Sequence, residues 1–152
     1  MKAARLTAQG APLELVELPI PTPGPNEVLL RLEACGVCHT DVHIRDGTEP
    51  LAEGTMPLTL GHEGVGIVEA VGANVTGIGR GERFGAAWLH DTCLTCRDCL
   101  TGHESICANQ RAHGMHVDGA FAEYVLVDPA FAVRIPDSLD PLQSEDWRHE
   151  EA

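Results

Sequence analysis

The sequence predicts a mainly β fold, a compact barrel of short strands with few and short helices. Three observations lead to this prediction: β-compatible runs alternate with turn residues, prolines crowd an early connector, and glycines are abundant. The chain has 16 glycines and 10 prolines among 152 residues. Many glycines stand at turn positions, such as Gly77, Gly79 and Gly81. This pattern is more typical of a β-barrel than of a layered α/β sheet.

Strands are expected where aliphatic and β-branched residues gather between turn residues. The expected strands cover residues 3–6, 13–18, 28–32, 65–71 and 121–127. In the third run, Val28, Leu30 and Leu32 alternate with Arg31 and Glu33. That alternation is the pattern of a strand with one buried face, although a further leucine at position 29 weakens it.

The segment between the second and third strands is expected to be an extended connector. Prolines at positions 19, 21, 23 and 25 exclude a helix there, because proline lacks an amide hydrogen and restricts the residue before it. Helices are expected only as short turns, one directly after Cys38 and one at residues 97–101. No repeat of fixed period is visible.

Length and composition indicate one soluble globular domain. Hydrophobic residues make up 43% of the chain and charged residues 22%, which are ordinary globular values. The 23 acidic and 10 basic residues give a net charge of −13. Such a charge repels phosphate backbones and anionic lipids, so no nucleic-acid and no membrane partner is expected. No secretory signal or membrane-spanning run is visible, and a cytoplasmic location is therefore expected.

Four cysteines, Cys93, Cys96, Cys99 and Cys107, are close enough in sequence to share one metal ion. Zinc takes four thiolates in a tetrahedron, and four thiolates leave no open position, so such a site is structural. An iron–sulfur cluster is less favoured, since its fourth cysteine is usually spaced differently and followed by proline. Disulfides are also less favoured, because they belong to oxidising compartments and no secretory signal is present.

A second group of metal-capable side chains lies upstream, at residues 38–43 (CHTDVH) and 61–64 (GHEG). Cysteine and histidine both suit zinc, and three protein ligands with one open position define a catalytic zinc site. Single cysteines and histidines are also common in ordinary cores. Spacing alone leaves the metal site and the core interpretation evenly balanced.

The order of these motifs resembles that of the zinc-dependent medium-chain alcohol dehydrogenases. The likeness rests on residues 36–41 (GVCHTD), 61–66 (GHEGVG), the four clustered cysteines, residues 114–124 and residues 135–137 (IPD). It implies a GroES-like catalytic domain over residues 1–142, a distorted β-barrel with a small structural-zinc lobe at residues 93–107. Residues 143–152 have no counterpart in the family and are expected to be an acidic tail.

The resemblance also implies roles for individual residues. Cys38 and His62 would be ligands of a catalytic zinc, and Glu63 would lie beside the metal or replace its bound water. Thr40 and His43 would form a relay that carries the proton of the alcohol to solvent. The zinc would lower the pKa of the alcohol, and NAD or NADP would accept the hydride as the alcohol becomes an aldehyde or ketone.

Three further roles follow from the same resemblance. Asp41 would orient the ligating His62, since such partners fix the tautomer of a metal ligand. His39 would contact the pyrophosphate of the cofactor, and Trp88 would form an aromatic wall of the substrate pocket, although a tryptophan suits a plain core equally. Cys35 has no family role and is expected to be a small apolar residue.

The sequence also departs from the family. No dinucleotide-binding glycine fingerprint is present, because Glu69 stands where the third glycine after Gly64 and Gly66 is required. The family's third zinc-ligating cysteine is also missing, since no cysteine follows Cys107. We therefore expect a truncated chain that is inactive alone and that self-associates through an exposed apolar face. The alternative is a zinc-binding or interaction module without catalysis.

Overall fold

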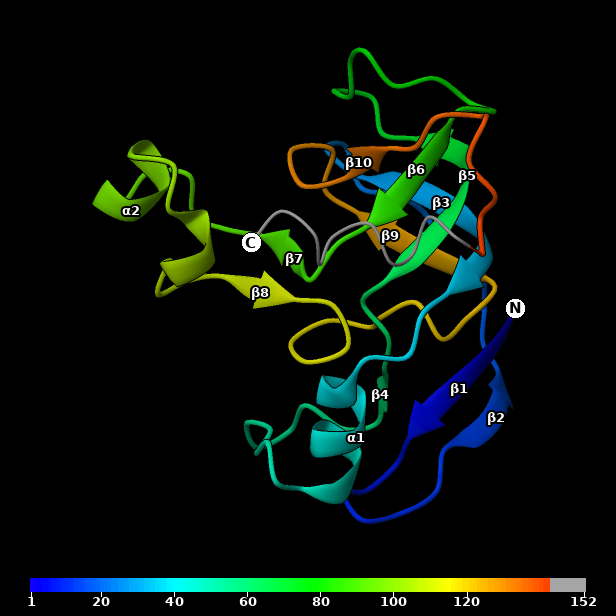
Figure 1. Cartoon of the computed structure of the whole chain (residues 1–152), viewed down its shortest axis with the longest axis vertical. Coiled ribbons are helices and arrows are strands. Elements are labelled where there is room, and N and C mark those ends of the chain that lie inside the picture. Colours follow the sequence, from blue (N-terminus) through cyan, green and yellow to red (C-terminus); the bar gives the residue numbers. More distant parts are fainter. Residues whose placement is uncertain (143–152) are drawn as a thin grey trace.

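The computed structural model describes residues 1–142, and the prediction of a mainly β fold with few short helices is confirmed (Figure 1). The predicted acidic tail at residues 143–152 lies outside the described residues. The elements in chain order are β1 (Lys2–Leu6), β2 (Glu14–Glu17), β3 (Val28–Cys35), α1 (His39–Asp46), β4 (Leu58–Thr59), β5 (Gly64–Val71), β6 (Arg83–Ala86), β7 (Leu89–Asp91), α2 (Arg97–Leu100), the 3-10 helix η1 (Glu104–Ile106), β8 (Arg111–Ala112), β9 (Tyr124–Val127) and β10 (Val133–Arg134).

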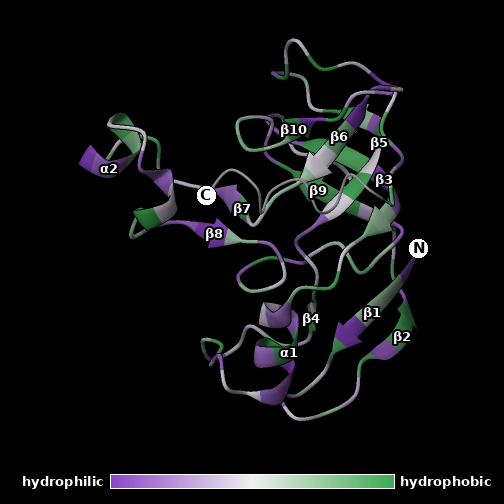
Figure 2. Cartoon of the chain, in the orientation of Figure 1, coloured by the Kyte–Doolittle hydropathy of each residue, from purple (hydrophilic) through white to green (hydrophobic). Residues whose placement is uncertain are grey.

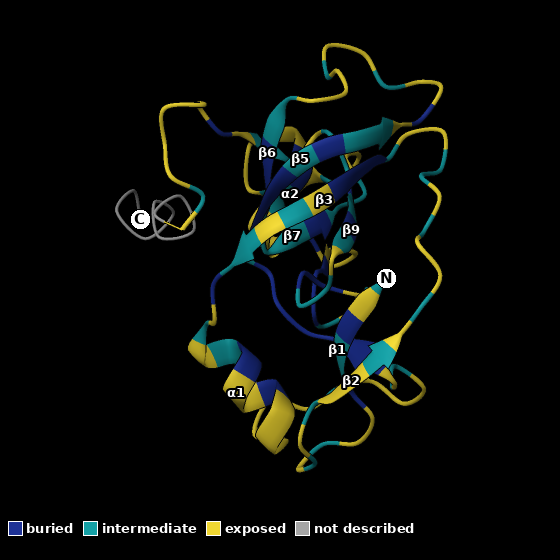
Figure 3. Ribbon diagram, turned by 90° about the vertical axis from the view of Figure 1, so that its right-hand side faces the viewer, coloured by how far each residue is buried: buried dark blue, intermediate teal, exposed yellow. Residues whose placement is uncertain are grey.

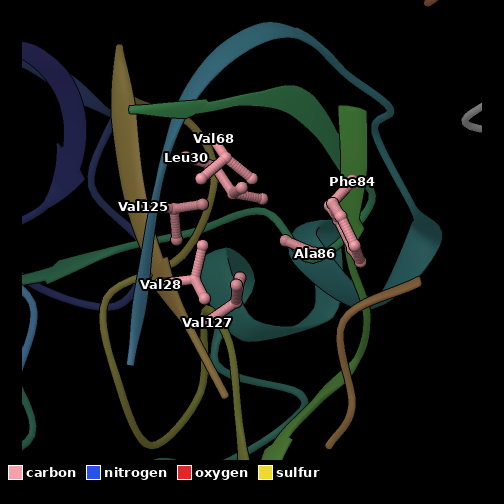
Figure 4. Close-up of a cluster of buried hydrophobic side chains, with 7 residues drawn as sticks. All are labelled: Val28, Leu30, Val68, Phe84, Ala86, Val125 and Val127. Atoms are coloured by element: carbon pink, nitrogen blue, oxygen red, sulfur yellow. The ribbon is translucent and has the colours of Figure 1, made fainter. Parts of the chain in front are cut away.

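The main sheet has five strands in the order β10-β6-β5-β3-β9, and every neighbouring pair is antiparallel. β3 lies between β5 and β9, and its Leu29 is buried together with its neighbours instead of facing solvent. The hydrophobic core of this sheet is shown in Figure 4 and consists of Val28, Leu30, Val68, Phe84, Ala86, Val125 and Val127. The two outer strands, β9 and β10, do not pair with each other, so the distorted barrel is open among the described residues.

A smaller sheet, in the order β2-β1-β4, packs with α1 around a second core. Leu6, Ile44, Leu58 and Leu60 form that core. Figure 3 shows the buried side of α1 facing the small sheet and its exposed side facing away. The helix is largely hydrophilic (Figure 2), so its inward stripe is narrow. Ile44 is its one fully buried apolar side chain among the described residues.

The four-cysteine lobe projects from the rest of the molecule (Figure 1). It contains α2 and η1, and the chain enters and leaves it through the paired strands β7 and β8. Several apolar side chains of this lobe are exposed, namely Leu94, Leu100 and Ile106. A lobe with so little buried apolar surface needs another source of stability, as small domains commonly do.

None of the helices in the described part of the chain has the length and apolar composition that crossing a bilayer requires.

Candidate metal centres

The four cysteines of the lobe lie at the corners of a tetrahedron. Sγ of Cys93 is 3.8 Å from that of Cys99 and 3.6 Å from that of Cys107, and Sγ of Cys96 is 3.5 Å and 3.9 Å from the same two atoms. Zinc–sulfur bonds of about 2.3 Å place the sulfurs of a tetrahedral site about 3.8 Å apart. The four side chains therefore fit a single zinc ion with all positions filled by protein.

Local backbone geometry builds this lobe. Leu94 has a φ of 53°, which turns the chain sharply between the first two cysteines. Cys96 caps α2 and accepts a hydrogen bond from the N–H of Cys99 at 3.5 Å, while its own N–H donates to Cys93 Sγ at 3.3 Å. Backbone N–H donors of Thr95 and Cys96 lower the pKa of Cys93 to about 5. Such donors favour the thiolate, which is the form that binds metal.

The second group, Cys38, His62 and Glu63, is assembled by strand pairing. One ligand atom from each of the three residues lies within 4.8 Å of the other two. The register of β3 and β5 pairs Cys35 with Gly64, so the residues that follow β3 lie beside those that precede β5. Residues distant in sequence thus converge at one end of the main sheet.

Asp41 connects the two halves of this second site. Its buried carboxylate accepts hydrogen bonds from the N–H groups of Cys38 at 3.1 Å and Gly61 at 3.0 Å. Its Oδ1 also lies 3.5 Å from Nδ1 of His62, which leaves Nε2 as the nitrogen available for an ion. Burial alone would lower the pKa of His62, but Asp41 and Cys38 outweigh it and the pKa is raised. The carboxylate thus faces the imidazole of His62, as the predicted role of Asp41 requires.

Gly36 lies in close contact with Glu63. A Cβ at position 36 would lie 2.5 Å from Oε2 of Glu63, and the N–H of Gly36 donates to the carbonyl oxygen of Glu63 at 3.1 Å. A side chain at position 36 would force the Glu63 carboxylate to move from this point. This contact of Gly36 was not predicted from the sequence.

The two residues predicted to form a proton relay are not joined in this structure. Oγ1 of Thr40 lies 3.6 Å from Sγ of Cys38, at the site itself. His43 is one helical turn further along α1, and its Nδ1 instead forms a hydrogen bond with Oγ1 of Thr48 at 2.9 Å. The ring of His43 is stacked on that of His39 with centroids 4.7 Å apart. Within residues 1–142, no hydrogen bond connects Thr40 to His43.

An open cleft of about 780 Å³ contains the second site. Trp88 lies in its wall and meets the ring of His62 edge-on, with centroids 4.9 Å apart. The wall also includes residues that were not predicted from the sequence, namely Gln110, Met115, His116 and Phe131. These residues lie before β8, after β8 and after β9, so no sequence spacing could have indicated that they share a cleft.

A buried histidine pair was also missed. Nδ1 of His90, on β7, lies 3.1 Å from Nε2 of His113, which directly follows β8. The ring of His113 lies 2.7 Å from the carbonyl oxygen of Ala87 and 3.0 Å from that of Leu126 on β9. Burial lowers the pKa of His90, and the neighbouring Asp91 opposes this effect only in part. The pair attaches the base of the four-cysteine lobe to the main sheet.

Comparison with known proteins gives one consistent result. Residues 24–137 match the alcohol dehydrogenase GroES-like domain. An alcohol dehydrogenase of Rhizobium meliloti is 46% identical over 140 residues, covering 92% of this chain and 41% of that protein. Among solved structures, a thermostable alcohol dehydrogenase from Pyrobaculum aerophilum has a TM-score of 0.85 at 34% identity, covering 95% of this chain and 43% of the other. An NAD-dependent alcohol dehydrogenase has a TM-score of 0.86 at 34% identity, with 95% and 42% covered. The chain therefore spans about two-fifths of the length of these relatives.

Proposed function

The chain belongs to the family of alcohol dehydrogenase GroES-like domains, and on that premise we propose that it is the catalytic domain of a zinc-dependent alcohol dehydrogenase. The proposed reaction oxidises a small alcohol to an aldehyde or ketone, with release of one proton and transfer of a hydride to NAD or NADP. The observation that carries the proposal is the cluster of Cys38, His62 and Glu63 inside an open cleft.

The chemistry of the donor set suits zinc at both sites, although in different ways. A thiolate, an imidazole and a carboxylate are all zinc ligands, and three such ligands leave one coordination position for a substrate oxygen. When bound, zinc supplies Lewis acidity that lowers the pKa of a hydroxyl, and the nicotinamide supplies the hydride acceptor. Four cysteines at tetrahedral spacing leave no such position, so the lobe site is proposed to be structural.

Residues around the second site are proposed to bind, orient and deprotonate the alcohol. Thr40, which lies beside Cys38, would accept the hydroxyl proton of the alcohol and pass it towards His43. Because these two side chains are not hydrogen-bonded to each other here, the relay requires a bridging group or a side-chain rotation. Trp88 would hold the carbon chain of the alcohol against one wall, and His39 would meet the cofactor pyrophosphate.

We propose further that the 152-residue chain by itself does not catalyse the oxidation of alcohols. It carries no glycine fingerprint for a dinucleotide and no cysteine beyond Cys107. Glu63 would then be the third ligand of the second zinc, supported by its position within 4.8 Å of the other two ligand atoms. Steady oxidation of ethanol by the purified chain with NAD or NADP would contradict this proposal.

Partners and location are proposed on general physical grounds. A small alcohol or aldehyde is the proposed substrate, and the net charge of −13 argues against nucleic acid and anionic membranes. The cytoplasm is the proposed location. Exposed apolar side chains such as Val37, which is 74% exposed, favour self-association of the chain. Exposed apolar patches associate at protein concentrations on the order of tens of micromolar. Sedimentation that shows only a monomer at such a concentration would argue against self-association.

Zinc content tests the proposed function directly. Elemental analysis of the purified, reduced chain is expected to give two zinc ions per chain, and the variant Cys38→Ser is expected to give one. Cys35→Ser is a matched control, because Cys35 lies three residues earlier and its thiol donates a hydrogen bond to the carbonyl oxygen of Gly36. This control is expected to keep both ions.

The alternative function, a zinc-binding module without catalysis, makes a different prediction. This alternative is favoured because the four-cysteine site, whose ligand set is complete, fits a zinc ion better than the three-ligand site does. In that case the wild-type chain would hold a single zinc, and Cys38→Ser would leave the content unchanged. That result would refute the catalytic proposal.

A further inference from the structure

Two histidines on the exposed side of α1 lie stacked against each other. His39 and His43 are four residues apart on the helix, and both side chains are exposed. Their ring centroids are 4.7 Å apart, and their planes are within 23° of parallel. Helical residues at this spacing lie on one face, and two histidines four apart on one helix face are a known metal-binding arrangement.

The hydrogen bonds of His43 determine which of its nitrogens is available to an ion. Oγ1 of Thr48 lies 2.9 Å from Nδ1 of His43 and donates its proton to the carbonyl oxygen of the same histidine at 3.2 Å. Because a hydroxyl has only one hydrogen to donate, it must accept its other hydrogen bond from Nδ1–H. The neutral ring therefore has its lone pair on Nε2. Metal-ligating histidines are typically held in this way, with the second nitrogen donating to a neighbour.

The ring of His39 completes the pair. Within residues 1–142 this ring is stacked on His43 and makes no hydrogen bond. A tetrahedral ion with bonds of about 2.0–2.1 Å needs two nitrogens about 3.3 Å apart. The exposed side chain of His39 can reach that spacing by rotation about its own bonds, while Thr48 holds the ring of His43. The net charge of −13 also attracts cations to the surface.

We propose that His39 and His43 form a two-histidine surface site for a divalent transition-metal ion. Imidazole ligands suit nickel, copper and zinc rather than magnesium or calcium. The site uses no ligand atom of the cysteine-containing clusters. An ion held there would engage the two imidazoles to which the proposed function assigns cofactor contact and proton transfer. The inference that a bound ion would inhibit alcohol oxidation rests on that proposed function. The inference of the binding site itself does not.

Calorimetric titration of the zinc-loaded full chain with Ni²⁺ tests the site. Replacing either histidine, by His39→Ala or His43→Ala, is expected to weaken Ni²⁺ binding about a hundredfold, since two linked ligands bind about 10²–10⁴ more tightly than one. Thr48→Ala is expected to weaken it about tenfold, because it removes the hydrogen bond that orients the ligand. Circular dichroism and thermal unfolding check that each variant folds, which is expected at exposed positions.

His103 provides a matched control. It is exposed, and its Nδ1 lies 3.1 Å from Oγ1 of Thr101, which donates to a backbone carbonyl in the same manner. No second imidazole is stacked on it within the described chain. His103→Ala is therefore expected to leave Ni²⁺ affinity unchanged.

Two outcomes would overturn the proposed pair: equal Ni²⁺ affinity in the wild type and His43→Ala, or an equal loss in His103→Ala. The zinc that is lost on replacing Cys38 with serine, measured on the same preparation, reports the second cysteine-containing site independently of the histidine pair. A chain with one zinc and a normal nickel titration would refute the proposed catalytic site and leave the histidine pair standing. A chain that holds two zinc ions but binds no nickel would refute the histidine pair and leave the proposed catalytic site standing.

Discussion

The two cysteine-containing sites differ in how the chain brings their ligands together. The four cysteines of the lobe lie within one loop, and local turns and the short helix α2 place them at tetrahedral spacing. The ligands of the second site come from the ends of two different strands and meet only because β3 and β5 pair in one register. A local site depends on its own loop, whereas a site built across a sheet depends on the whole sheet.

The largest expected effect is loss of metal from the lobe. Cys99→Ser removes one of four thiolates from a site whose zinc affinity in comparable folds corresponds to about 10–16 kcal/mol. We expect the lobe to release its zinc to a chromophoric chelator while the second site keeps its ion. The far-ultraviolet signal of the main sheet is expected to persist. Loss of both ions together would show that the two sites are not independent.

A change in the β3–β5 pairing should weaken zinc binding at the second site and leave zinc binding in the lobe intact. A Cβ at Gly66 would lie 2.4 Å from the carbonyl oxygen of Arg31 on β3, so Gly66→Ala must push the strands apart. We expect a loss of about 1–3 kcal/mol in the free energy of unfolding, measured in urea, and weaker zinc binding at the second site only. Gly79→Ala is the control, because a Cβ there meets nothing closer than 3.9 Å. Equal effects of the two variants would contradict the role of the register.

A smaller effect is expected from Asp41→Asn. The variant keeps the shape of the side chain but removes the charge that faces His62. Removing such a partner typically costs about 10–100-fold in metal affinity. We expect that loss at the second site and none at the lobe, as measured by chelator competition. Asp46→Asn, an exposed change on the same helix, should leave both affinities unaltered.

The smallest expected effect is a pH dependence of stability that arises from the buried pair of His90 and His113, which joins the lobe to the main sheet. The pKa of His90 is lowered in the folded protein, so the unfolded chain binds more protons between that lowered value and about 6.5. The stability contributed by neutral His90 is complete above about pH 6.5 and falls as the pH drops below that value. Urea unfolding at several pH values should show this fall in the wild type and a reduced fall in His90→Gln. His103→Gln should follow the wild type.

Much of the fold could be predicted from the sequence, because the longer strands carry a clear pattern. The predicted runs at residues 3–6, 13–18, 28–32 and 65–71 correspond to β1, β2, β3 and β5. Strands β4, β7, β8 and β10 have only two or three residues, which is too short for any periodicity to appear. The last predicted strand starts later than expected, at Tyr124, because Phe121 packs instead into the smaller core.

The candidate sites were predictable to different degrees for the same physical reason. The lobe ligands could be assigned from spacing alone, and the tetrahedral distances agree with that assignment. The second group required a resemblance, because sequence spacing says nothing about strand register. The individual roles of Thr40, His43, His39 and Trp88 remain predictions. The cleft wall and the His90–His113 pair had no local signal, since tertiary contacts alone create them.

The route of the chain into the lobe has an evolutionary consequence. Both ends of the lobe return to the same two neighbouring strands, β7 and β8, so the loop between them is topologically an insertion. A change in the length or sequence of such an insertion leaves every residue of the main sheet paired with the same residues of the neighbouring strands. Descendants of this domain could therefore diversify the lobe freely. The segment between β3 and β5 is constrained differently, because every deletion there must preserve the meeting point of two strands.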